Sequence, residues 1–163
     1  MLKNLSATKK GMITGLLMIG FSLLFYYCKF PFDSPLEYMI YVVYAAGVVW
    51  AVLEFARSAD HTAKFGAYFS QGFKCFIVVT LLMVLFTFIF NTLHPEFEAQ
   101  MAANYREEVI KTGNKTPAEI NSEIEKIKDY YIVVLLSGAI FSYLIIGAVV
   151  SAFASYLLKR RKS

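Results

Sequence analysis

Four long stretches of apolar residues dominate this sequence, and none of them has a charged residue in its middle. They cover about residues 11–28, 36–55, 73–93 and 131–158. A helix needs roughly 20 mostly apolar residues to cross the ~30 Å hydrocarbon core of a bilayer. Because the stretches are continuously apolar rather than alternating, they indicate helices and not the strands of a membrane barrel. The sequence therefore predicts an all-α fold, a four-helix transmembrane bundle.

The composition leads to the same fold class. Hydrophobic residues make up 58% of the 163 residues and charged residues only 17%, whereas soluble domains are about 45–50% apolar and about 25% charged. This balance argues against a disordered chain, a repeat solenoid and a typical cytosolic enzyme. The first stretch ends in bulky aromatic residues without a small-residue cleavage site, so we expect a retained helix rather than a signal peptide. We expect residues 1–163 to form one integral membrane domain.

Lysine and arginine are distributed unevenly between the segments that connect the four stretches. Ten lie in the two chain ends and the segment between the second and third stretches, and six lie in the other two segments. Because cytoplasmic segments carry an excess of these residues, both termini are predicted to be cytoplasmic. The net charge of +4 then reflects topology and anionic headgroups, and no nucleic-acid partner is expected.

Residues 95–130 form the one sizeable polar segment, and they predict an amphipathic helical hairpin on the extracytoplasmic side, between the third and fourth spans. Four apolar residues recur at every fourth position of its first helix and form one face: Phe97, Met101, Tyr105 and Val109. The run from Thr116 to Glu119 is a capping box with proline at the first helical position. The second helix is expected to continue into the fourth span. The hairpin either packs on itself or docks on the outer leaflet or a partner protein.

Small residues recur on the first and fourth stretches at spacings that bring them onto one helix face. They are Gly11, Gly15, Gly138, Ser142, Gly147, Ser151 and Ser155. Small side chains let membrane helices approach closely. We expect packing within the bundle, with self-association through the same faces as the alternative.

A few polar residues lie within the apolar stretches and are candidates for an intramembrane site. Thr80, Thr87 and Asn91 follow one another at i, i+7 and i+11, which favours hydrogen bonds between helices over a pore lining. Glu54 ends the second stretch, and a carboxylate at membrane depth is a functional candidate by default. Near the interface it could instead pair with Arg57 or Lys74.

No residue pattern points to chemistry at a metal or catalytic centre. The topology assigns His61 and His94 to opposite faces, so they cannot share a metal ion. Cys28 and Cys75 fall at opposite membrane boundaries, too far apart for a disulfide. Nucleophile motifs, phosphate-binding glycine loops and paired intramembrane carboxylates are missing from the sequence. We therefore predict no catalytic residue, no bound metal and no cofactor.

Several short motifs follow one another in a fixed order after a basic start. They are Leu53-Glu54-Phe55-Ala56-Arg57, Phe69-Ser70-Gln71-Gly72-Phe73-Lys74, His94-Pro95-Glu96-Phe97 and Ser151-Ala152-Phe153-Ala154. In these features nearly the whole chain resembles an uncharacterised family of four-span bacterial inner-membrane proteins, the domain-of-unknown-function family numbered 4199. The resemblance implies a bacterial inner-membrane location and an association with envelope-building proteins such as polyprenyl-phosphate glycosyltransferases. It brings no activity, substrate or catalytic residue.

The function expected from these features is that of a non-enzymatic membrane subunit or scaffold of an envelope-associated complex. It would dock a membrane-protein partner, or a second copy, through the hairpin, the small-residue faces or the 56–72 loop, in which the candidate residues are Arg57, Lys64, Tyr68 and Phe69. The alternative is a small oligomeric transporter or lipid-linked-sugar flippase built around Glu54, Asn91 and the threonines. A membrane enzyme ranks third, because no acid, base and metal groups converge in the sequence.

Overall fold

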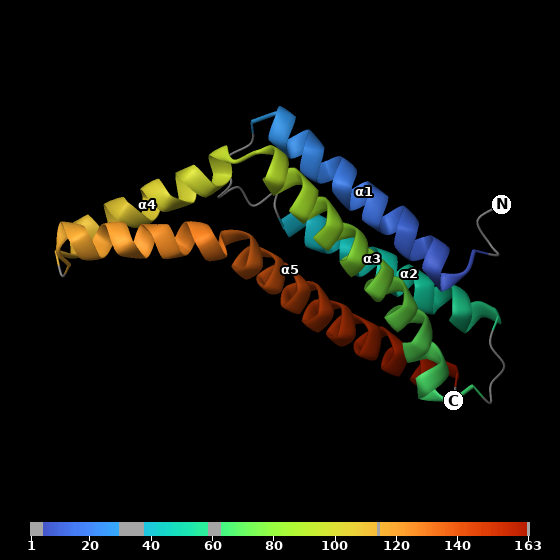
Figure 1. Cartoon of the computed structure of the whole chain (residues 1–163). Helices are drawn as coiled ribbons and strands as arrows, with labels where there is room; N and C mark the ends of the chain where they lie inside the picture. The colour runs from blue at the N-terminus through green and yellow to red at the C-terminus, as the bar shows by residue number, and fades with distance from the viewer. Residues whose placement is uncertain (1–4, 30–37, 59–62, 114, 163) are drawn as a thin grey trace. The chain divides into compact units, whose positions relative to one another are not determined.

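The computed structural model describes residues 5–29, 38–58, 63–113 and 115–162 (Figure 1). Within these ranges the chain is 92% helical and has no strand. The helices, in chain order, are α1 (Ala7–Tyr27), α2 (Tyr38–Ser58), α3 (Phe65–Leu93), α4 (Glu96–Thr112) and α5 (Pro117–Lys162). The prediction of an all-α fold is confirmed.

Four of the helices, α1, α2, α3 and α5, are long and apolar enough to cross a membrane. They overlap the four predicted stretches, but their bounds differ from those of the stretches. The Ser6 hydroxyl caps α1 by accepting the backbone N–H of Lys9 at 3.4 Å, and α3 begins at Phe65 rather than near residue 73. Hydropathy marks where the hydrocarbon core ends, whereas a helix continues until its backbone is capped or broken.

The chain divides into two compact units, whereas the sequence suggested a single domain. Residues 1–83 and 140–163 form the first, here called the bundle unit, and residues 84–139 form the second, here called the hairpin unit. Both α3 and α5 contribute to each unit.

In the bundle unit, α1 and α3 run in the same direction. Gly11 of α1 lies against the backbone of Cys75, and Gly15, one turn later, lies against Leu82. A Cβ atom at residue 11 would come within 2.6 Å of the Cys75 carbonyl oxygen. The two helices therefore touch through the glycine face of α1, which only a residue without a side chain allows at this separation.

The other two helices of the bundle unit run in the opposite direction. Gly47 of α2 packs against Thr14 of α1. Ser151 of α5 donates a hydrogen bond to the Phe69 carbonyl of α3 at 3.3 Å. This alternation places the starts of α1 and α3 and the ends of α2 and α5 at one end of the bundle unit.

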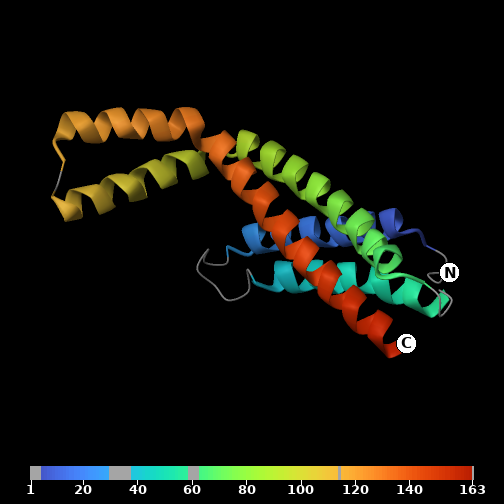
Figure 2. The same ribbon diagram turned by 90° about the horizontal axis from the view of Figure 1, so that it is seen from below.

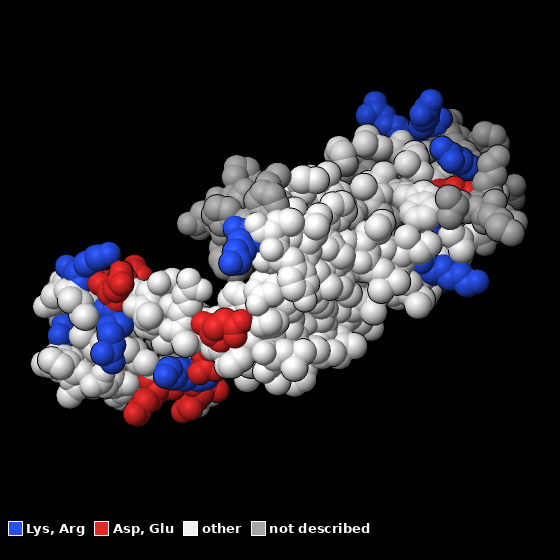
Figure 3. Space-filling view, turned by 90° about the horizontal axis from the view of Figure 1, so that it is seen from above, with Lys and Arg blue, Asp and Glu red and all other residues white. Residues whose placement is uncertain are grey.

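That end of the bundle unit is strongly basic, and we call it the basic end. Figure 3 shows lysine and arginine side chains gathered there, with little acidic surface among them. The described cationic residues at the helix termini that meet at this end are Lys9, Lys10, Arg57, Lys64, Lys159, Arg160 and Arg161.

In the hairpin unit, α4 and the first part of α5 lie side by side (Figure 2). Their contact is an apolar cluster of Ala102, Val109, Ile120 and Ile124, with Tyr105 partly buried against it. Helix α4 is capped by Gly113, whose φ of 67° is left-handed and whose N–H bonds to the Val109 carbonyl. The predicted hairpin is therefore present, and it packs on itself.

Candidate functional site

The most unusual polar residue in the bundle unit is Lys10, a lysine that is only 3% exposed. Its ammonium lies 5.5 Å from the centroid of the Trp50 ring on α2, within cation–π distance. Burying an ammonium is costly unless it is paired. Lys10 is therefore a candidate functional residue on the ground that nothing in ordinary helix packing requires a charge there.

Glu54 lies one turn after Trp50 on α2, at the basic end. Its Oε2 lies 3.7 Å from a guanidinium nitrogen of Arg57, and the two side chains are 16% and 72% exposed. Of the two partners considered from the sequence, Arg57 is therefore the one that pairs with it. A pair this long, with one exposed member, adds little to stability.

Sequence reasoning missed Lys10 and Trp50 as members of one cluster. Lys10 was counted with the basic N-terminal segment, because a lysine next to an apolar stretch is usually a solvated anchor. A usable signal was its spacing: Lys10 lies four residues before Thr14 and next to Gly11, on the face of α1 that the structure buries. Its carbonyl accepts the Thr14 hydroxyl at 2.9 Å.

Two of the three candidate polar residues of α3, Thr80 and Asn91, make side-chain hydrogen bonds to protein atoms. In the bundle unit, Thr80 is 5% exposed and donates to the Phe76 carbonyl of its own helix at 2.8 Å. In the hairpin unit, Asn91 donates to the Thr87 carbonyl at 2.9 Å. Its side-chain oxygen accepts the hydroxyl of Tyr131 on α5 at 2.8 Å. Asn91 thus makes the bond between helices that its position predicts. Thr80 donates within α3 and also has a side-chain hydrogen bond with Tyr44 of α2.

The small residues of α5 fall into two groups. Gly147 packs against the Tyr44 hydroxyl and the Phe76 ring, where a Cβ atom would lie 2.6 Å from the ring carbon Cγ. Ser151 and Ser155 are fully buried. The Ser155 hydroxyl has no hydrogen-bond partner in the described part of the chain.

Gly138 and Ser142 differ from these residues because both are exposed. A Cβ atom at residue 138 would meet no atom within 4 Å. The expectation that they pack inside the bundle is therefore not met. A four-residue spacing defines a helix face but does not determine whether another helix covers it.

The 56–72 segment is mostly helical rather than a loop, since α2 ends at Ser58 and α3 begins at Phe65. Tyr68 is 1% exposed, and its ring meets that of Phe55 edge-on at 5.2 Å. It belongs to a core cluster and is not available for docking, contrary to the prediction. It was assigned to the surface because the helix start was placed too late.

The remaining candidates of this segment lie nearer the surface. Lys64 and Arg57 are exposed. Phe69 is half-buried between the rings of Phe65 and Phe73, at 6.0 and 6.3 Å.

Most of the predicted docking face of α4 is buried in the core of the hairpin. Val109 is buried and Tyr105 packs against the core, whereas Met101 is 46% exposed. Phe97 is half-buried, with its ring 5.8 Å from that of Phe90. The buried position is Ala102 rather than Met101, because a strict four-residue spacing drifts around a helix of 3.6 residues per turn.

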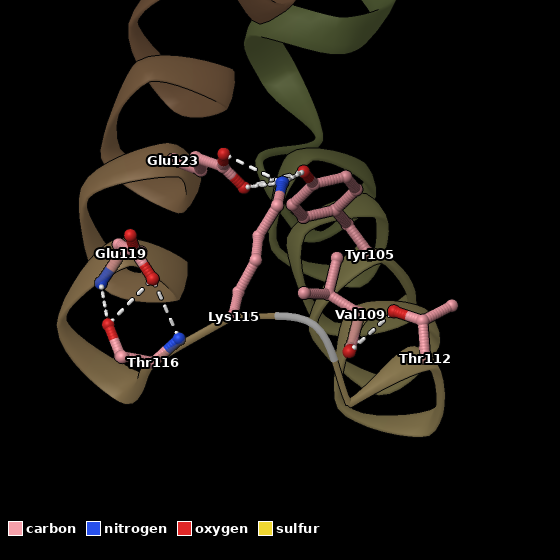
Figure 4. Close-up of polar contacts among 7 residues, drawn as sticks. All are labelled: Tyr105, Val109, Thr112, Lys115, Thr116, Glu119 and Glu123. Atoms are coloured by element: carbon pink, nitrogen blue, oxygen red, sulfur yellow. Dashed lines mark hydrogen bonds and ion pairs between the residues drawn. The ribbon is translucent and has the colours of Figure 1, made fainter.

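A polar cluster joins the two helices of the hairpin near its turn (Figure 4). The Lys115 ammonium contacts both Glu123 oxygens at 2.7 Å, and the Tyr105 hydroxyl donates to Glu123 at 2.8 Å. The Glu123 carboxylate raises the pKa of Lys115. The predicted capping box is confirmed: Glu119 accepts the Thr116 backbone N–H at 2.8 Å.

The histidines and cysteines say little about a functional site. His94 lies 2.8 Å from Glu96, and His61 falls outside the described residues. Cys28 and Cys75 are both free, Cys28 exposed and Cys75 buried. Among the residues that the structure describes, no group of three metal-binding side chains occurs.

The order of spans and hairpin can be compared with known families. The model of a family described as a protein of unknown function (DUF4199) matches residues 9–160, nearly the whole chain. The chain belongs to this family. The match covers all four predicted stretches and the hairpin, and it includes Lys10, Trp50 and Glu54. No curated protein and no solved structure matches the chain.

Proposed function

We propose that this chain is a non-enzymatic membrane subunit or scaffold of an envelope-associated complex, and that it docks another membrane protein through its hairpin. The observation that carries the proposal is the self-closed hairpin. Its apolar stripe is buried on itself around Val109 and Ile124, so the hairpin does not need to lie on lipid to cover its apolar face. A preformed element of this kind binds a partner at a low cost in ordering.

The surface of the hairpin offers apolar contacts together with charge. Met101 and Ile110 of α4 are 46% and 61% exposed. They lie nine residues apart, which places them about 180° apart around the helix. A partner that contacts one face of α4 therefore covers one of them and leaves the other in water.

The proposed location is the bacterial inner membrane, with both termini in the cytoplasm. Support comes from the basic end, where the start of α1 and the end of α5 meet a cluster of lysine and arginine. Cytoplasmic segments of membrane proteins carry this excess of positive charge. The proposed partners are the bilayer and a membrane protein or second copy; the proposal includes no nucleic acid, metal or cofactor.

A scaffold is favoured over a transporter because three of the four polar side chains expected along a path bond to protein atoms. Thr80 donates to the Phe76 carbonyl, and Asn91 bonds to Thr87 and Tyr131. Glu54 pairs with Arg57 near the helix end.

Affinity purification from native membranes tests the proposal. The tagged full chain is extracted in mild detergent as wild type, Met101→Glu and Ile110→Glu, and the proteins retained are identified by mass spectrometry. We expect one membrane protein to be retained by the wild type and lost with one of the two variants only. Recovery of no partner, or equal retention by all three proteins, would contradict docking through α4.

A further inference from the structure

We draw no further inference here: the strongest candidate, the exposed face of α5 that holds Gly138 and Ser142, is a stripe of small residues, and nothing in the described part of the chain shows what covers it.

Discussion

The bundle unit and the hairpin unit are both made of helices, but different forces hold them together. In the bundle unit, helices meet through Gly11, Gly47 and Gly147, where a side chain would collide with the neighbouring helix. In the hairpin unit, α4 and α5 meet through larger apolar side chains such as Val109 and Ile124, with charged groups around them. Lipid is as apolar as leucine, so helices in a membrane gain mainly from close approach, whereas helices in water gain from burying apolar surface.

The largest effect is expected for a substitution that tests the close approach of helices in the bundle unit. Gly147→Leu forces a side chain into the space held by Tyr44 and Phe76, and we expect it to destabilise the bundle by about 3 kcal/mol or more. Unfolding by denaturant in detergent micelles measures this change.

The matched control is Gly138→Leu on the same helix, where a Cβ atom meets no neighbour. It is expected to change the stability by less than about 0.5 kcal/mol. A similar loss in both variants would mean that close helix contact is not what holds the bundle unit.

The next largest effect is expected for a substitution that tests the burial of apolar side chains in the hairpin unit. Ile124→Ala removes a side chain that is 8% exposed in the hairpin core, and we expect a loss of about 2 kcal/mol. Hydrogen exchange of the α4 amides reports this loss locally. Ile110→Ala, at a position 61% exposed, serves as the control and should leave the exchange of the α4 amides unchanged. Faster exchange in the Ile110→Ala variant would contradict the assignment of Ile110 to the surface and of Ile124 to the hairpin core.

A smaller effect is expected for one hydrogen bond in the hairpin unit. Tyr131→Phe removes the hydroxyl that Asn91 accepts, at an expected cost of about 1 kcal/mol. Tyr130→Phe changes the adjacent residue, which is 62% exposed, and should cost nothing measurable. Thermal unfolding in detergent distinguishes them, and equal midpoints would argue against the α3–α5 bond.

The smallest effect is expected for the exposed ion pair of the hairpin. Glu123→Gln weakens the contact with Lys115, so the hairpin amides should exchange slightly faster in low salt. The difference from wild type should vanish at about 1 M salt, where charges are screened over about 3 Å. A difference that persists in high salt would show that the side chain acts through packing.

The pH dependence of this pair follows from the raised pKa of Lys115. A raised pKa in the folded state means that the pair's contribution is complete below the ordinary lysine pKa. The contribution is lost as the pH rises through the raised value. The difference between wild type and Glu123→Gln should therefore shrink at strongly alkaline pH and stay constant near neutrality.

Local features of this fold were predictable from the sequence, whereas the contacts between helices were predicted only in part. The four spans follow from hydropathy, and the capping box follows from Thr116 and Glu119 being three residues apart. The burial of Lys10 and Tyr68 depends on which helix face meets a neighbour, which periodicity does not determine. Ala102 replaced Met101 in the hairpin core because the small shift between four and 3.6 residues per turn accumulates along α4.

The central claim is a four-span protein with its basic end in the cytoplasm and its hairpin on the other side of the membrane. Cysteine labelling tests it directly, in a background with Cys28→Ser to remove the exposed native thiol. Met101→Cys and Lys64→Cys are treated with a membrane-impermeant maleimide on intact spheroplasts and after lysis. We predict labelling of residue 101 in intact cells and of residue 64 only after lysis. Labelling of both residues in intact cells, or the reverse pattern, would contradict the account.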